Sequence, residues 1–175
     1  LWQMHTERMK SYGFDRLIYG YTNFRSEGSL GELDDFVILS NHNREYLDGF
    51  LAGGLYFNGP MVKWTLENNG ACSWALVADK AKQGLLTPEE DRVLRFNKQM
   101  GVMAGYTISF PTMSSRTKGA IALTACRDMS QEDADEIWKN VGSEIELANN
   151  IAHLKIQSLP YEFPKRALTS RQKEV

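Results

Sequence analysis

The sequence predicts an α/β/α sandwich, with a central, mainly antiparallel sheet of about five strands and helices on both faces. Two observations lead to this class. Short segments rich in β-branched and aromatic residues follow one another without room for a crossover helix, which favours antiparallel pairing. Segments with apolar residues at helical spacing lie between these pairs and can cover both faces. A chain of 175 residues suits one domain with a sizeable core, plus a tail.

The first predicted elements are a helix and a strand. Residues 2–12 carry an apolar stripe at helical spacing, and Gly13 follows where helices commonly end. Residues 17–22 are mostly β-branched or aromatic and predict a strand. Gly20, inside that strand, indicates a close approach by something bulky.

An exposed loop, a second strand and two short helices are expected next. Residues 25–35 combine glycines with acidic side chains and predict the loop, and residues 36–39 predict the strand. Residues 43–52 begin with an asparagine that can cap a helix. Residues 60–66 begin with proline, which fits the first helical turn, and an Asn-Asn-Gly turn then leads towards a strand near Trp74.

The second half of the chain predicts a helix, a hairpin and a long helix. Residues 87–100 open with threonine, proline and a glutamate at the third helical position, which is a capping box. Residues 105–110 and 119–125 predict two strands joined by a polar turn. Residues 130–157 open with a serine followed three residues later by aspartate, and their apolar stripe runs over about seven turns.

Composition narrows the class of protein. A net charge of −2 and a pI near 6.0 argue against direct binding of a nucleic acid by these 175 residues. Cys72 and Cys126 lie far apart and fit small buried hydrophobic residues in a reducing compartment. The apolar runs are too short to span a membrane, and the N-terminus lacks a signal-peptide pattern. We therefore expect a cytoplasmic protein that does not bind membranes.

No arrangement of residues predicts an enzyme or a metal site. His5, His42 and His153 are far apart and lack the spacing of metal ligands. Ser114 and Ser115 are not part of a nucleophile elbow, and no phosphate-binding or dinucleotide-binding loop is present. We therefore expect a binding protein without a cofactor, and a small α/β enzyme is the alternative.

The last eight residues predict the start of another helix. Thr169 can cap it, and Gln172 is placed three residues later to complete a capping box. The stretch over residues 168–175 also resembles the opening of the helix-turn-helix in LuxR-type transcription factors. The resemblance implies three parts: a ligand-sensing domain over 1–157, a linker over 158–168, and over 169–175 the start of a truncated DNA-binding domain.

The rest of the chain resembles the autoinducer-binding domain of the same regulators. The matching positions, in chain order, are Gly13-Phe14, Gly20, residues 41–50, Gly59-Pro60, Trp74, Thr107 and residues 119–122. The resemblance implies a mostly apolar pocket between the sheet and the helices over 43–52 and 60–66. The residues expected to contact a ligand there are Gly20, His42, Tyr46, Phe50, Gly59, Met61, Trp74, Thr107 and Ala122.

Four of these positions depart from the pattern of lactone receptors. The resemblance implies that Tyr46, Gly59 and Phe50 occupy the places of a Trp, an Asp and a Tyr that hydrogen-bond the lactone. Ala122 stands where many receptors have Ser or Thr. A buried ligand amide without its acceptor costs on the order of 1–3 kcal/mol. These departures leave three possibilities open for the pocket: it binds an acyl-homoserine lactone, it binds another small amphiphile, or it binds no ligand.

The sequence thus predicts the ligand-sensing and dimerisation domain of a LuxR-type quorum-sensing regulator. Its expected partners are a small-molecule signal such as an acyl-homoserine lactone, a second copy of the chain, and DNA through a C-terminal domain absent from this sequence. Leu147 and Leu154 lie off the main stripe of the long helix and predict a homodimer contact. The alternatives are a regulator with a divergent pocket, or a truncated module that sequesters a full-length regulator.

Overall fold

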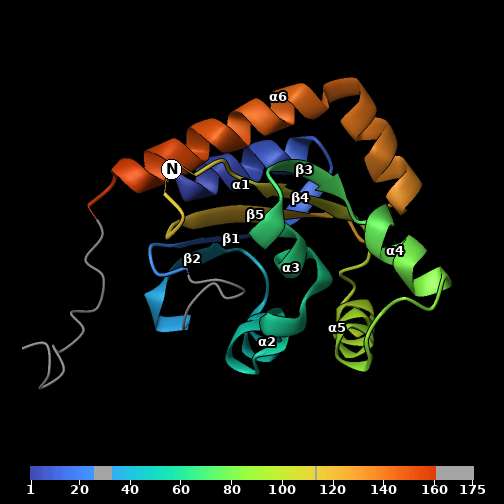
Figure 1. Ribbon diagram of the computed structural model, residues 1–175. Helices are drawn as coiled ribbons and strands as arrows, with labels where there is room; N and C mark the ends of the chain where they lie inside the picture. The colour runs from blue at the N-terminus through green and yellow to red at the C-terminus, as the bar shows by residue number, and fades with distance from the viewer. Residues whose placement is uncertain (26–32, 113, 161–175) are drawn as a thin grey trace, which may run out of the picture.

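Five antiparallel strands form one sheet in the order β2-β1-β5-β4-β3 in the computed structural model, which describes residues 1–25, 33–112 and 114–160 (Figure 1). The strands are β1 (Phe14–Thr22), β2 (Phe36–Ser40), β3 (Gly70–Ser73), β4 (Gly105–Ser109) and β5 (Lys118–Ala125). The α-helices are α1 (Trp2–Ser11), α2 (Arg44–Leu47), α3 (Pro60–Glu67), α4 (Ala75–Lys82), α5 (Pro88–Gln99) and α6 (Gln131–Ser158). Most of the predicted loop over 25–35, most of the linker and the predicted final helix lie outside the described residues.

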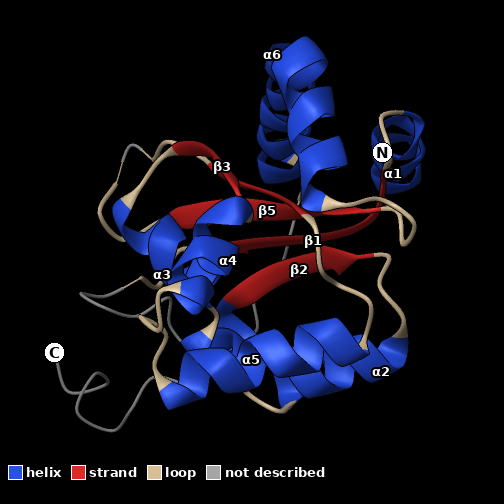
Figure 2. Ribbon diagram, turned by 90° about the vertical axis from the view of Figure 1, so that its right-hand side faces the viewer, coloured by secondary structure: helices blue, strands red, loops and turns tan. Residues whose placement is uncertain are grey.

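Helices lie on both sides of this sheet. Helices α1 and α6 cover one face, and α2 and α5 lie across the other, with α3 and α4 beside them (Figures 1 and 2). The predicted α/β/α sandwich with an antiparallel sheet of five strands is therefore confirmed.

The predicted helix starts are confirmed by their hydrogen bonds. The Asn43 side chain accepts the backbone N–H of Tyr46 and begins α2. Thr87 and Glu90 form a reciprocal capping box at the start of α5, and Ser130 forms another with Asp133 at the start of α6. These bonds satisfy backbone N–H groups that have no partner inside a helix.

The strand predicted near Trp74 is confirmed, because β3 ends directly before this residue. Two local features differ from the predictions. Helix α4 was not predicted, because its N-cap, Trp74, makes no side-chain capping bond and gives no start signal. The helix expected over 43–52 is regular only in α2 and continues as a π-helical segment, η2 (Asp48–Ala52), in which the Gly53 N–H reaches back to the Asp48 carbonyl at 2.7 Å.

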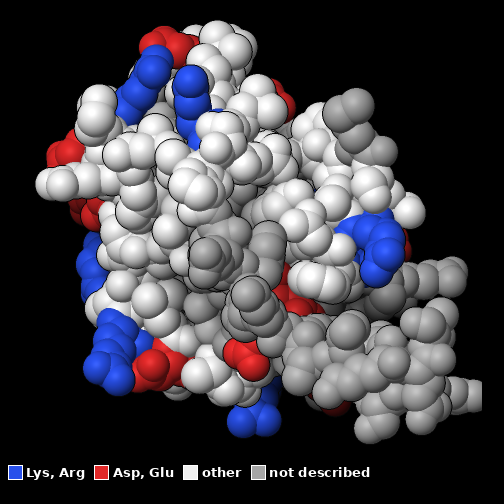
Figure 3. Space-filling view, turned by 90° about the vertical axis from the view of Figure 1, so that its left-hand side faces the viewer, with Lys and Arg blue, Asp and Glu red and all other residues white. Residues whose placement is uncertain are grey.

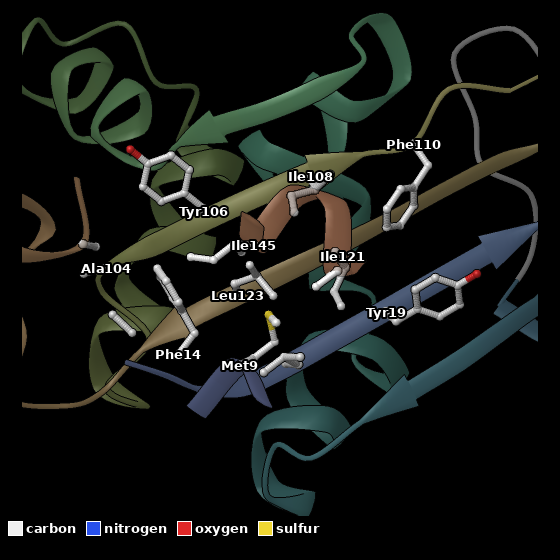
Figure 4. Close-up of a cluster of buried hydrophobic side chains, with 14 residues drawn as sticks. Met9, Phe14, Tyr19, Ala104, Tyr106, Ile108, Phe110, Ile121, Leu123 and Ile145 are labelled. Atoms are coloured by element: carbon white, nitrogen blue, oxygen red, sulfur yellow. The ribbon is translucent and has the colours of Figure 1, made fainter. Parts of the chain in front are cut away.

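The core lies between the sheet and the pair α1/α6. Alternate residues of β1, β4 and β5 point to this face and are buried there. Figure 4 shows these side chains meeting Met9 of α1 and Ile145 of α6. The strand residues in this cluster are Phe14, Leu17, Tyr19, Tyr106, Ile108, Ile121, Leu123 and Ala125.

The opposite face of the sheet carries small side chains at its centre. Gly20 lies beside Ala120 in the pairing of β1 with β5, and Ala122 lies beside Thr107 in the pairing of β5 with β4. A Cβ atom added at Gly20 would meet the Phe36 ring at 3.8 Å and no nearer group of the described protein. The small residues instead leave space between the sheet and the helices below it.

Candidate functional site

A cavity of about 510 Å³ lies between this small-residue face and the helices α2, α3, α4 and α5. It is lined by all nine residues that the sequence singled out for ligand binding: Gly20, His42, Tyr46, Phe50, Gly59, Met61, Trp74, Thr107 and Ala122. The structure thus brings together residues from β1, β4, β5 and the segment between β2 and α4. That these side chains contact a ligand remains a prediction.

An aromatic column forms one wall of the cavity. The ring of Tyr46 stacks on His42, with centroids 4.4 Å apart, and on Phe50, with centroids 5.3 Å apart. The helical repeat places Phe50 of η2 four residues after Tyr46 of α2, and His42 lies just before the Asn43 N-cap. The Tyr46 hydroxyl donates to Asn97 Oδ1 of α5 at 3.2 Å, and burial raises the pKa of this phenol. The column is therefore fixed at its centre by α5.

Trp74 is held by the sheet rather than left free. Its indole Nε1–H donates to Thr107 Oγ1 at 2.8 Å, which joins the start of α4 to β4. Thr107 is buried and can still donate its own hydroxyl proton. This pair therefore offers a ligand a flat apolar surface beside one small polar group.

His42 is buried at the end of the cavity where β5 ends. Its Nε2 lies 3.5 Å from Thr124 Oγ1. Burial, and secondly the positive charge of Arg16, lower the pKa of His42 to about 4. The imidazole is therefore neutral near pH 7, and it can act as one donor and one acceptor but not as a cation.

Gly59 occupies the N-cap position of α3, where its backbone is extended with φ −64° and ψ 120°. It supplies no side-chain cap. A Cβ atom here would lie 3.1 Å from Val62 Cγ2 and 3.3 Å from the Tyr56 carbonyl oxygen. Any side chain therefore fits only with a small adjustment, although the backbone angles suit every residue.

Sequence reasoning missed several residues of the lining. Asn97 fixes Tyr46, but the two are 51 positions apart and nothing in the sequence connects them. Tyr56 and Thr124 also line the cavity. Lys118 does so as well, and strand alternation does contain a signal for it, since Lys118 lies four residues before Ala122 on the same face of β5.

The chemistry of the lining fits binding rather than turnover of a ligand. Most of the lining is aliphatic or aromatic, and its polar groups are few. Within the parts of the chain that the structure describes, no group of three or more His, Cys, Asp and Glu side chains is placed to hold a metal ion.

The described helices also include none that is long and apolar enough to cross a membrane.

Charges do not gather on the face of the molecule shown in Figure 3. Lys and Arg side chains there are scattered among Asp and Glu side chains and are separated by uncharged areas. Nucleic-acid binding relies on a concentrated Lys/Arg surface. The part of this face that the described residues form shows no such concentration of Lys and Arg.

Comparison with known proteins identifies the fold and the family. The sequence model of the autoinducer-binding domain matches residues 1–156. No curated protein sequence gives a significant match to the chain.

Solved structures of LuxR-type regulators share the fold. CepR2 from Burkholderia cenocepacia, described as an N-acylhomoserine lactone-dependent LuxR family transcription factor, is 18% identical with a TM-score of 0.62, and the match covers 86% of this chain and 79% of CepR2. SdiA from Escherichia coli is 12% identical with a TM-score of 0.60, covering 99% of this chain and 67% of SdiA. The ligand-binding domain of VqsR from Pseudomonas aeruginosa is 13% identical with a TM-score of 0.53, and the match covers 87% of this chain and 85% of the VqsR domain.

The resemblance inferred from the motifs is thus confirmed over nearly the whole chain. The family consists of signal-binding domains of transcription regulators and not of enzymes. On the match over residues 1–156, the chain belongs to the autoinducer-binding domain family of LuxR-type quorum-sensing regulators.

Proposed function

We propose that this domain senses a small amphiphilic signal by enclosing it in the 510 Å³ cavity, and that it does so as a homodimer. The cavity is the observation that carries this proposal. Pockets for small molecules typically measure about 300–1,000 Å³ and combine apolar walls with a few polar groups, as this one does. Structural relatives agree with such a ligand, since CepR2 is described as lactone-dependent and SdiA has been solved with octanoyl-rac-glycerol, at 10% identity and a TM-score of 0.61.

Ligand binding would act through the stability of the folded domain. A ligand that binds only the folded state stabilises it by about 2.7 kcal/mol at a concentration one hundred times its Kd. The small floor residues, Gly20 and Ala122, leave the space that the ligand's apolar body would fill. A stabilised dimer would then set the distance between two DNA-reading helices.

The division of the chain is part of the same proposal. Residues 1–157 form the sensing domain, 158–168 a linker, and 169–175 the start of a helix-turn-helix that reads DNA. The last of these segments lies outside the described residues. Its resemblance to the first helix of LuxR-type DNA-binding domains supports the assignment.

Blocking the cavity tests the proposal. Ala122→Phe places a ring on the cavity floor, whereas Ala52→Phe adds the same ring at an exposed position outside the lining. Wild type and Ala52→Phe should gain several degrees in Tm with excess N-octanoyl-homoserine lactone or 1-octanoyl-rac-glycerol, since about 1 kcal/mol shifts a domain of this size by roughly 2–4 °C. Ala122→Phe should gain less than about 1 °C on the same scale. Equal shifts in all three proteins would place the ligand elsewhere and contradict the proposal.

Helix α6 supplies the proposed dimer surface. Leu147, Ile151 and Leu154 form a stripe at helical spacing and are 60%, 50% and 64% exposed. Replacing Leu147 and Leu154 together by Glu should weaken dimerisation at least about tenfold, because charges would be buried in an apolar contact. Sedimentation at tens of micromolar, with ligand present, measures this. Leu85→Glu, at an equally exposed leucine between α4 and α5, is the control and should leave the dimer intact. A monomeric wild type would contradict the assignment.

A further inference from the structure

A buried lysine lies at the end of the cavity opposite His42. Lys118 begins β5 on the face that carries Ala120 and Ala122, and only 4% of the residue is exposed. Lysine is rarely buried without a partner, because transferring an ammonium group out of water is costly. Lys118, which lines the cavity, therefore needs polar partners for its ammonium group.

The ammonium group of Lys118 has neutral partners in the protein. It donates to the Asn68 carbonyl oxygen at 3.1 Å and to Asn69 Oδ1 at 3.0 Å. An ammonium group has three N–H donors, so these two bonds leave one donor for another acceptor. No carboxylate of the described residues forms an ion pair with it.

A second positive charge adds to the field at this end of the cavity. The Arg25 guanidinium donates to the Leu66 carbonyl oxygen at 2.6 Å, and its charge acts on Lys118. Burial, and secondly the charge of Arg25, lower the pKa of Lys118. An anion placed beside the ammonium group would favour its charged form and so offset both effects.

Two prominent donors of the lining are already engaged inside the protein. The Trp74 indole donates to Thr107, and the Tyr46 hydroxyl donates to Asn97. Gly59 offers no side-chain acceptor for a ligand amide. The polar features of the cavity therefore favour a ligand that brings its own acceptor, and a negative charge, to Lys118.

The geometry points to an amphiphile with a carboxylate head as the ligand class, with its head on Lys118 and its apolar chain along the floor formed by Gly20, Ala120 and Ala122. This inference rests on the proposed function, because it requires that the cavity bind a small amphiphile at all. It goes further by naming the head group and the residue that selects it. A carboxylate accepts charge-assisted hydrogen bonds, which are about twice as strong as neutral ones.

Matched ligands measure the contribution of the head group. Decanoic acid and methyl decanoate share a chain and differ in charge, and N-octanoyl-homoserine lactone provides a neutral family signal. At pH 8, calorimetric titration of the wild-type domain should give a Kd for decanoic acid at least tenfold below that for methyl decanoate. Comparable affinities for the acid and the ester would overturn the inference while leaving the proposed function intact. Binding of none of the three ligands would overturn both.

Three variants assign the preference to Lys118. In Lys118→Met the acid should lose its advantage and bind within about twofold of the ester. Lys118→Arg keeps the charge and should retain most of the preference. Lys10→Met removes an exposed lysine of α1 that is not part of the lining and should change neither affinity. Ester binding by Lys118→Met, together with its ligand-free Tm, shows that the cavity remains folded. Retention of a tenfold preference in Lys118→Met would refute the role of this residue.

Discussion

Lowering the pH from 7 to 5 is expected to reduce the free energy of unfolding by about 4 kcal/mol through two histidines, His42 and His153. Burial lowers the pKa of both to about 4 in the folded protein, whereas an unfolded histidine has its ordinary value of 6.5. Between these values the unfolded chain takes up protons that the folded chain excludes, so stability is present above pH 6.5 and is lost as the pH falls towards 4. Each histidine accounts for about 2 kcal/mol of the change between pH 7 and 5.

His153 makes this effect testable because its contacts are well defined. The imidazole stacks on Phe110, with centroids 4.0 Å apart, and its Nδ1 lies 2.9 Å from the Tyr19 hydroxyl. Protonation would therefore place a charge between α6 and the sheet. His5, which contacts Asn149 of α6 at 2.9 Å, also has a pKa lowered by burial and adds to the same trend.

Urea unfolding at pH 5, 6 and 7 measures the effect. His153→Gln should lower the free energy of unfolding at pH 7, because the stacking on Phe110 is lost. It should also reduce the change in this free energy between pH 7 and pH 5 by about 2 kcal/mol. His42→Gln should remove a similar share, and the double variant should remove both. The pKa of Asp133 is lowered by its hydrogen bond with the Ser130 backbone N–H. Such carboxylates change the free energy of unfolding only at a pH below this range. An unchanged pH dependence in the double variant would show that other groups cause the acid sensitivity.

Gly59→Asp is expected to strengthen lactone binding by tenfold or more. The new carboxylate would accept the ligand amide N–H, which is worth roughly 1.5–3 kcal/mol when buried and well aligned. A buried carboxylate without a partner is generally destabilising. At residue 59 this cost is offset, because the residue is the N-cap of α3 and Asp is among the best N-cap residues. The ligand-free Tm of Gly59→Asp should therefore stay close to that of the wild type.

Titration with a series of acyl-homoserine lactones tests this variant. Gly59→Ala is the matched control, since it introduces the Cβ atom next to Val62 without an acceptor, and it should show no gain in affinity. Wild-type protein that binds a lactone tightly, with no improvement in Gly59→Asp, would contradict the inference that the departures at Gly59 and Phe50 changed ligand choice. An equal gain in Gly59→Ala would show that the added Cβ atom or the stiffer backbone, not the acceptor, is responsible.

Local signals explain which parts of the fold were predictable. The capping boxes at Thr87 and Ser130 are contained within four residues, and both are present. Helix α4 has no such signal, and the π-helical segment η2 depends on packing, since a Cβ added at Gly49 would lie 2.4 Å from the Phe96 ring. Elements defined by local hydrogen bonds were therefore predictable, whereas those shaped by tertiary contacts were not.

The candidate site shows the same division. The order and spacing of Tyr46, Gly59 and Trp74 indicated the lining through a family resemblance, and the cavity contains all three. What these residues do there depends on long-range partners, such as the bond from Trp74 to Thr107 across 33 positions. The same is true of Lys118, whose buried state follows from Asn68 and Asn69 on a distant segment. Sequence spacing thus predicted which residues meet, and the structure was needed to see which donors are already engaged.

Retention of a small amphiphile by the cavity tests the central claim most directly. The wild-type domain is incubated with a mixture of acyl-homoserine lactones, acylglycerols and fatty acids, freed of unbound ligand, denatured and analysed by mass spectrometry. We expect wild type to release about one amphiphile per chain and Ala122→Phe, whose cavity is filled, to release almost none. Release of no member of the mixture by the wild type, or equal release by the two proteins, would contradict the assignment of the cavity as a signal-binding site.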